Sequence, residues 1–367
     1  MAGIRTVTMA ELVSELADAP AMCEVPDRLS LLYLPPNARI VASPDDLFAD
    51  LDGLEPQVPG PVLCPSIDYS RAGRLPTFRL DHEPLGTGLN AVLATRYDEV
   101  AQCLLQQSNV AAHIAERVQA VRPDCVVWLI VDGLAFGDVV RHARAWLPRA
   151  RPVLVDGVST TKLGMPRLIG STSLVSRLFG QGYVNAHGFT YWNREGNDLT
   201  DRLFTGFGGN VTASRSIADV VTSLGSLSLD RTFVQVIRDG TDHVAHDWRD
   251  TPPIGSLVQG CFDQFERLAE LVRDAGRSGL LFLSTDHGML WREEHQLITL
   301  PEPGLPAPRY HETSRIGERI FNFRGSEGAS SAMQYPYVRR KLRTNEWGVH
   351  GGLSYEESVI PLVELAV

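Results

Sequence analysis

Short apolar runs alternate with amphipathic stretches along the second two-thirds of the chain. The apolar runs cover residues 126–131, 153–155, 233–237, 280–283 and 359–367, and residues 254–275 repeat apolar positions at helical spacing. Runs of strand length that are apolar at almost every position, separated by helices, are typical of a parallel sheet that is buried on both faces. The pattern therefore predicts an α/β fold for this part of the chain, with a parallel sheet flanked by helices.

The first 120 or so residues follow a different pattern. Residues 8–19 and 99–121 are predicted as helices, 31–34 and 38–42 as short strands, and 56–65 as a loop rich in Pro and Gly. This predicts a small α+β domain of unknown role over residues 1–120 and a larger domain over 121–367. Residues 290–346 open with a proline-rich stretch and lack the sheet pattern, so they are predicted as an insertion in the larger domain.

The amino-acid composition indicates the number of domains, the cellular location and the kinds of partner to expect. The 367 residues are 44% hydrophobic, enough for about two domains, and no apolar run has the length of a membrane span. The five cysteines are widely spaced and include no C-x-x-C pair, which favours unpaired thiols in a reducing compartment. With no secretory signal pattern, we expect a cytoplasmic protein without membrane contact.

Charge is unevenly distributed. The net charge of −10 argues against a general nucleic-acid coat. Residues 309–343 nevertheless contain eight basic and three acidic side chains, a local balance of +5. A basic segment of this kind fits an anionic substrate, and it equally fits a solvated face of the insertion.

Polar side chains follow soon after four of the predicted strands. They are Asp132, then Thr160 and Thr161, then Asp242 and His246, then Asp286 and His287. In open α/β sheets, ligands bind outside the carboxyl ends of the strands. We therefore expect these side chains to meet at one edge of the sheet.

The histidine and carboxylate spacing suggests metal ligands. Asp242 and His246 form D-x-x-x-H, and a carboxylate with an imidazole suits zinc. That segment also holds Asp239, His243 and Asp247, so the ligand assignment is open at this point. Asp286 and His287 stand next to each other before a glycine, where an ordinary strand-ending turn is the alternative. His350 joins such a site only if its loop folds back to the edge of the sheet.

Asp132 and the threonines also have simpler interpretations. An Asp directly after a buried strand needs a cation or hydrogen bonds, or it caps a following helix. Ser159, Thr160 and Thr161 precede a predicted helix, where Ser and Thr are common capping residues. The same position suits an activated hydroxyl nucleophile and phosphate binding at a helix start.

Taken in chain order, these residues resemble the alkaline phosphatase superfamily, and in particular its PglZ branch. The resemblance rests on four segments: VDGLAFGD at Asp132, TTKLGMPRL at Thr161, STDHG at Asp286 and HGGLSYEESVIPL at His350. The last segment is the most specific. The resemblance runs from about residue 126 to the end of the chain and does not include the first 120 residues.

The resemblance implies an alkaline-phosphatase-like fold with two divalent metal ions, zinc first and manganese as the alternative. One ion would be held by Asp242, His246 and His350, and the other by Asp132, Asp286 and His287. Thr161 would be the nucleophile, because the family's threonine stands directly before the basic-Leu-Gly-Met string, and Thr160 is the alternative. Lys162 and an arginine of residues 309–343 would bind phosphate oxygens.

The implied activity is hydrolysis of phosphate esters, as a phosphodiesterase or nuclease acting on nucleotides or oligonucleotides. The PglZ family is associated with BREX-type anti-phage systems, which implies defence-system proteins as partners. The alternatives are a phosphomonoesterase for a small metabolite and a metal-stabilised scaffold without turnover. Cys64-Pro65-Ser66 matches the sulfatase C-x-P-x-R motif poorly, which argues against cleavage of sulfate esters.

Overall fold

The computed structural model describes residues 93–169, 172–190, 208–213, 229–246, 248–292, 309–316, 320–324, 330–334 and 346–367, with the short strands named below and positions 90, 206 and 222. The chain forms two compact units. One contains residues 1–92 and 96–104, and the other contains residues 93–95 and 105–367.

The first unit contains a five-stranded sheet in which every strand pair is parallel. The order is β1 (Arg5–Val7), β5 (Thr77–Leu80), β2 (Met22–Glu24), β4 (Val62–Cys64) and β3 (Arg39–Ile40). Helix α4 (Tyr97–Cys103) also belongs to this unit. Strand β3 lies within the predicted strand 38–42, and β4 lies in a stretch predicted as a loop. The helix predicted at 8–19 and the strand predicted at 31–34 lie outside the described residues.

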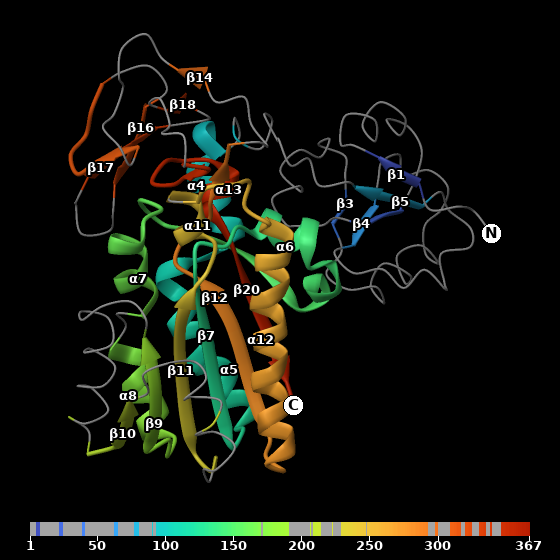
Figure 1. The fold of residues 1–367 in the computed structure, drawn as a ribbon, viewed down its shortest axis with the longest axis vertical. Coiled ribbons are helices and arrows are strands. Elements are labelled where there is room, and N and C mark those ends of the chain that lie inside the picture. Colours follow the sequence, from blue (N-terminus) through green and yellow to red (C-terminus); the bar gives the residue numbers. More distant parts are fainter. Residues whose placement is uncertain are drawn as a thin grey trace. The chain divides into compact units, whose positions relative to one another are not determined.

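The second unit is built on an eight-stranded sheet (Figure 1). Its order is β10 (Asn210–Ala213), β9 (Asn185–Thr190), β11 (Thr232–Asp239), β7 (Cys125–Asp132), β12 (Gly279–Thr285), β20 (Val359–Ala366), β8 (Ala150–Leu154) and β6 (Leu105–Gln106). All neighbouring pairs are parallel except those made by β20, which runs antiparallel to β12 and β8. The predicted α/β class, with a mainly parallel sheet flanked by helices, is confirmed.

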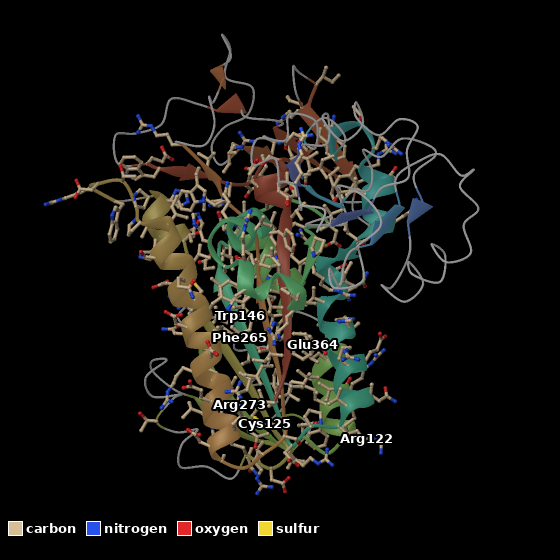
Figure 2. All side chains as sticks on the ribbon, turned by 90° about the vertical axis from the view of Figure 1, so that its right-hand side faces the viewer. Arg122, Cys125, Trp146, Phe265, Arg273 and Glu364 are labelled. Carbon is tan, nitrogen blue, oxygen red and sulfur yellow. The ribbon has the colours of Figure 1, made fainter. Side chains whose placement is uncertain are left out.

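Helices bury both faces of this sheet. Alternate residues of β7 point to opposite sides: Trp128 packs in a core with α5 (Val110–Val121), α7 (Thr161–Ile169) and α8 (Thr172–Gly180). Leu129 packs on the other side with α6 (Phe136–His142) and α12 (Ile254–Asp274). Figure 2 shows Trp146, from the 3-10 helix η4 (Arg144–Arg149), beside Phe265 of α12, with ring centroids 5.5 Å apart. A strand buried on both faces explains the uninterrupted apolar run.

Two local predictions differ from the structure. The helix predicted over 99–121 is divided into α4 and α5 by β6 and the 3-10 turn η3 (Gln107–Asn109). Pairing of β6 with β8 at the sheet edge competes with helical periodicity there. Strands β9 and β10 were not predicted, because Asn185, His187 and Asn210 interrupt the apolar pattern.

The segment predicted as an insertion begins and ends at a strand pair. Strand β13 (Leu290–Trp291) pairs antiparallel with β19 (Gly348–Val349). Between them lie the pair β14 (Ile298–Thr299) and β18 (Val338–Arg339), and the sheet β15 (Tyr310–His311), β17 (Ser330–Gln334) and β16 (Ile320–Arg324). Within the described part of the chain, none of the helices is both long and apolar enough to cross a bilayer.

Candidate metal centre

The sheet register brings three acidic residues to one level. Asp239 of β11 pairs with Asp132 at the end of β7, and Thr285 of β12 pairs with Val131. Asp286 therefore emerges beside Asp132 at the carboxyl ends of the strands. Helix α11 (Asp242–His246) begins directly after β11 and presents Asp242 at the same edge.

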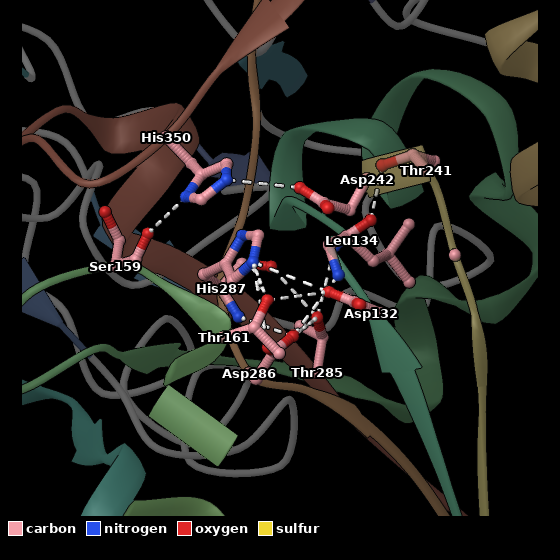
Figure 3. Close-up of polar contacts among 12 residues, drawn as sticks. Asp132, Leu134, Ser159, Thr161, Thr241, Asp242, Thr285, Asp286, His287 and His350 are labelled. Carbon is pink, nitrogen blue, oxygen red and sulfur yellow. Dashed lines mark hydrogen bonds and ion pairs between the residues drawn. The ribbon is translucent and has the colours of Figure 1, made fainter. Parts of the chain in front are cut away.

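His350 is brought to this edge by the pairing of two short strands. Leu290 pairs with Val349, and Trp291 pairs with Gly348, so the chain returns to the turn that carries His287. The imidazoles of His287 and His350 stack with centroids 4.3 Å apart (Figure 3). The loop therefore folds back, which the sequence alone left open.

Asp242, His246 and His350 converge on one point. Oδ1 of Asp242 lies 3.2 Å from Nε2 of His246 and 3.2 Å from Nε2 of His350. The two Nε2 atoms are 3.0 Å apart. Four-coordinate zinc with bonds of about 2.05 Å places its ligand atoms about 3.3 Å apart. The three donors thus already have the spacing of ligands on one ion.

Asp132, Asp286, His287 and Thr161 form a second cluster next to the first. Nε2 of His287 lies 3.5 Å from Oδ1 of Asp132 and 3.6 Å from Oδ2 of Asp286. The Thr161 hydroxyl donates to Oδ1 of Asp132 at 3.1 Å and lies 3.0 Å from Nε2 of His287. His287 stands between the clusters, because its ring also groups with Asp242 and His350 in a ligand-like arrangement.

Hydrogen bonds to the backbone orient two of the histidines. Nδ1 of His287 donates to the carbonyl of Gly288 at 2.9 Å, and Nδ1 of His350 donates to the carbonyl of Ser159 at 3.1 Å. Each imidazole therefore keeps Nε2 free of a proton when neutral, and Nε2 is the atom that faces the carboxylates. Metal-ligating histidines are commonly held in this way.

Asp286 provides a direct test of whether the site fits a cation. The side chain is fully buried, and Oδ1 accepts from the backbone N–H groups of Gly133 at 3.2 Å and His287 at 3.1 Å. Oδ2 is buried without a hydrogen-bond partner in the described structure. A buried carboxylate oxygen without a donor is costly unless a cation approaches it. The donor set also fits, since carboxylate and imidazole are zinc and manganese ligands.

The ionisation of the site reflects its burial. Burial raises the pKa of Asp286 to about 7. Burial alone would lower the pKa of His287, but the carboxylates of Asp286, Asp132 and Asp242 outweigh it and raise that pKa to about 10. In the metal-free protein these two groups hold protons that divalent cations would displace, since ligands bind metal in their deprotonated forms.

The first cluster shows the same competition. Burial acts to raise the pKa of Asp242, but the hydrogen-bonding contacts of His246 and His350 hold it well below its ordinary value. Burial, and then the charge of His287, lower the pKa of His350. His350 is thereby favoured as a neutral imidazole, the form that binds metal.

Close packing of glycines holds the carboxylate-bearing turns in place. A Cβ on Gly240 would collide with the backbone carbonyl of Asp132, and one on Gly164 of α7 would collide with that of Asp286. A Cβ on Gly288 would meet the carbonyl of Glu356. These close approaches let α7 and the strand ends lie against one another, which places Thr161 beside Asp132.

Several predicted residues lie elsewhere. The Lys162 side chain is 75% exposed and its ammonium lies 3.7 Å from Glu312, so it is outside both clusters. Arg309 is buried in an ion pair with Glu357. Of the other basic residues in 309–343, Arg315 and Arg324 are exposed and Arg339 ends β18, while Arg319, Arg340, Lys341 and Arg343 lie outside the described residues. His243 is exposed, and Nδ1 of its ring donates to the carbonyl of Gly240.

Sequence reasoning missed the residues that hold the site from behind. Ser159 and Glu357 bond to the turn after His350, and Gln107 donates to the carbonyl of Asp286. These partners are separated by between 5 and 193 residues in the sequence. In the sequence, Ser159 suggests only a helix cap, and Glu357 and Gln107 look like ordinary exposed polar residues, since Glu and Gln are rarely buried.

Comparisons with known proteins give a loose likeness. No protein-family model matches the sequence, and no curated protein matches it. Among solved structures, the chain is similar to murine ectonucleotide pyrophosphatase/phosphodiesterase 5, an inactive variant in complex with AMP, at 12% identity and a TM-score of 0.41 over 65% of this chain and 87% of that one. The human protein matches at 11% identity and 0.39, also over 65% and 87%. The zinc complex of the C-terminal periplasmic domain of EptC from Escherichia coli matches at 12% and 0.30, over 46% and 64%. Likenesses this loose are no evidence for a shared activity or substrate.

Proposed function

We propose that this chain is a two-metal phosphoester hydrolase of the PglZ type in the alkaline phosphatase superfamily, with Thr161 as its nucleophile. The observation that supports it most is the meeting of a threonine hydroxyl with two adjoining Asp/His clusters at the carboxyl end of a buried sheet. Asp242, His246 and His350 would hold one divalent cation. Asp132, Asp286 and His287 would hold the other.

The position of Thr161 supports its role over that of Thr160. Thr161 begins helix α7, and its Oγ1 contacts Asp132 and His287. The Oγ1 of Thr160 is buried without a hydrogen-bond partner in the described structure. Its carbonyl accepts from the backbone N–H groups of Leu163 and Gly164, so Thr160 closes the first turn of the helix.

The chemistry follows from this arrangement. Cations in such sites act as Lewis acids that stabilise negative oxygens. The Thr161 hydroxyl, which its hydrogen bond to Asp132 orients, loses its proton to solvent as Oγ1 forms a bond to phosphorus. The bond from phosphorus to the leaving oxygen breaks, and that oxygen takes up a proton from water. A water molecule then attacks phosphorus, the bond from phosphorus to Oγ1 breaks, the phosphate product leaves, and Oγ1 takes up a proton to restore Thr161. The protein's own part is positioning, as expected for phosphoryl transfer.

The substrate class proposed is a phosphodiester of nucleotides or oligonucleotides, in a cytoplasmic protein that works with anti-phage defence partners. The resemblance of the segments at Asp132, Thr161, Asp286 and His350 to PglZ supports this choice. The exposed cation of Arg315, in the segment that contacts Lys162 through Glu312, suits an anionic substrate.

Hydrolysis of bis-p-nitrophenyl phosphate and of p-nitrophenyl phosphate tests the proposal, with metal content measured by mass spectrometry. We expect two zinc or manganese ions per chain and faster turnover of the diester, abolished by chelator. Thr161→Ala should keep both ions and lose turnover. Thr160→Ala is the matched control, because it removes a neighbouring hydroxyl that contacts neither Asp132 nor His287, and it should keep most of the activity.

The other outcomes discriminate the alternatives. Preference for the monoester would make the protein a phosphomonoesterase. Two bound ions with no turnover of either ester would favour the scaffold. Activity that survives Thr161→Ala but not Thr160→Ala would move the nucleophile by one residue. Absence of metal after incubation with excess Zn²⁺ would contradict the two-metal site itself.

A further inference from the structure

Arg309 and Glu357 form an ion pair that is buried from solvent. Nε of Arg309 donates to Oε1 of Glu357 at 3.1 Å, and Nη2 donates to Oε2 at 3.0 Å. The side chains are 5% and 0% exposed. Paired N–H donors on one carboxylate fix both the distance and the plane of the two groups. This pair therefore holds Glu357 in a single orientation.

The carboxylate oxygens of Glu357 also accept hydrogen bonds from the turn that follows His350. Oε1 accepts from the backbone N–H of Gly352 at 2.9 Å, and Oε2 accepts from the Ser354 hydroxyl at 2.7 Å. Its backbone carbonyl accepts from the N–H of Gly288 at 3.0 Å. One residue thus contacts the turn after His350 through its side chain and the turn after His287 through its backbone.

Ser159 holds the same turn from the opposite side. Its hydroxyl donates to the carbonyl of Gly352 at 2.9 Å and accepts from the N–H of Gly351 at 3.0 Å. Its carbonyl accepts from Nδ1 of His350. Gly351 has a φ of +98°, a left-handed conformation that glycine adopts without strain. The backbone around His350 is therefore fixed by hydrogen bonds on both sides.

Stabilisation of the fold alone is a poor explanation for the buried Arg309–Glu357 ion pair. Burying two charges removes them from water, and an apolar pair of similar volume often stabilises a fold as well or better. Arg309 also has a φ of +79°, which is unfavourable for a residue with a Cβ. A charged pair and a strained backbone at the same position point to a role in the site that they contact.

We propose that Arg309 and Glu357 are positioning residues for His350, which set the affinity of the Asp242–His246–His350 cluster for its divalent cation. The inference rests on the proposed two-metal function. Arg309 belongs to the segment between β13 and β19, so this segment takes part in building the metal centre. Partners that orient a ligand from behind typically change metal affinity by about 10- to 100-fold when removed.

The test is a titration of the metal-free full chain with Zn²⁺ in competition with a chromophoric chelator. His350→Ala identifies the binding step that belongs to its cluster. In Arg309→Met, we expect that step to weaken by about 10- to 100-fold, while the other step changes by less than about threefold. The variant must be folded, as judged by its thermal transition in chelator.

Arg117→Met is the matched control. Nε of Arg117 also donates to both carboxylate oxygens of Glu364, at 2.9 and 3.0 Å, and this pair lies along the sheet between α5 and β20. Figure 2 shows Glu364 well down β20. Loss of this ion pair should leave both zinc affinities unchanged, whatever its effect on the thermal transition. If both zinc-binding steps weakened equally in Arg309→Met, the Arg309–Glu357 ion pair would only stabilise the fold, and the proposal would be overturned. Two unchanged binding steps would also overturn it.

Ser159→Ala provides a second, milder variant in case Arg309→Met does not fold. It removes the hydroxyl bonds to Gly351 and Gly352 and leaves the carbonyl that orients His350. We expect the same binding step to weaken selectively. Unchanged affinities in folded Ser159→Ala would contradict the idea that the turn sets the affinity. Fewer than two ions on the wild type would instead refute the proposed function, before any variant is compared.

Discussion

Replacing Asp286 by Asn should stabilise the metal-free protein at alkaline pH. The carboxyl is fully buried, and burial raises its pKa from an ordinary 3.8 to about 7. Between these two pH values the folded chain holds a proton that the unfolded chain has released, so raising the pH lowers the free energy of unfolding. At about 1.4 kcal/mol per pH unit, the difference corresponds to about 4 kcal/mol. Asn cannot ionise and avoids this loss.

Urea unfolding in chelator at pH 5.5 and pH 8 measures the effect. Because about 1.4 kcal/mol per pH unit applies only from pH 5.5 to the pKa of about 7, we expect the ionisation of Asp286 to cost the wild type about 2 kcal/mol between the two conditions, and Asp286→Asn to avoid this loss. With excess Zn²⁺ the order should reverse, because a ligand that binds only the folded state adds stability, by about 2.7 kcal/mol at 100 times its Kd. The variant lacks one carboxylate of the site and should gain less.

Asp138→Asn is the control for this experiment. Asp138 is equally buried, but it accepts from Arg141 at 2.7 Å and from the N–H of Ala135 at 3.1 Å, so its charge is compensated within the fold. That variant should be less stable than the wild type with and without Zn²⁺. If metal-free Asp286→Asn is no more stable than the wild type at pH 8, the buried carboxylate is satisfied by the fold itself and the reasoning is wrong.

Three further predictions concern the surroundings of the site. Gly288→Ala should lower the free energy of unfolding by more than about 2 kcal/mol, because the added methyl group would collide with the backbone carbonyl of Glu356. Gly260→Ala in α12, where the added methyl group meets open space, should raise the free energy of unfolding by about 0.5–1 kcal/mol. Thermal unfolding of the two variants measures the difference. Trp128→Phe should cost about 1–3 kcal/mol in urea unfolding, since the buried indole N–H donates to Ser284 at 2.8 Å; an unchanged midpoint would contradict this. Burial lowers the pKa of His187, so its contribution to stability is present above about pH 6.5 and is lost as the pH falls below that value. His187→Asn should therefore weaken the loss of stability at acidic pH. If the variant loses as much stability at acidic pH as the wild type, other groups cause that loss.

The strand ends could be predicted from sequence because their position follows from two local facts. Apolar runs mark buried strands, and parallel strands place their carboxyl ends at one edge. This was enough to expect Asp132, Asp242 and Asp286 at the same edge, where the structure has them. It was not enough for β9, whose apolar pattern is broken by Asn185 and His187, or for the predicted helix 99–121, which yields to strand pairing at β6.

The rest of the site depends on contacts that no local pattern contains. His350 reaches the edge only because β19 pairs with β13 across the inserted segment. The hydroxyl of Ser159 meets a turn 193 residues away, and Arg309 meets Glu357 across 48 residues. Such partners are fixed by tertiary packing, so a sequence can name the ligand candidates well before it can name the residues that hold them.

The distribution of hydrogen bonds around Asp286 explains how a folded chain keeps acidic residues available in a buried site. Backbone N–H groups satisfy one of its oxygens, which fixes the side chain, and the other oxygen is left facing Nε2 of His287. The histidines repeat this division, with Nδ1 bonded to a carbonyl and Nε2 towards the carboxylates. In each of these side chains, one polar atom is held by a hydrogen bond to the backbone and the other faces the centre of the site. Since the anchors are backbone groups of the strand ends and their turns, the large apolar cores on both faces of the sheet supply the rigidity. If both polar atoms of each side chain made hydrogen bonds within the protein, the fold would be more stable without metal and would bind metal less well. The stability of metal-free Asp286→Asn is therefore informative about function.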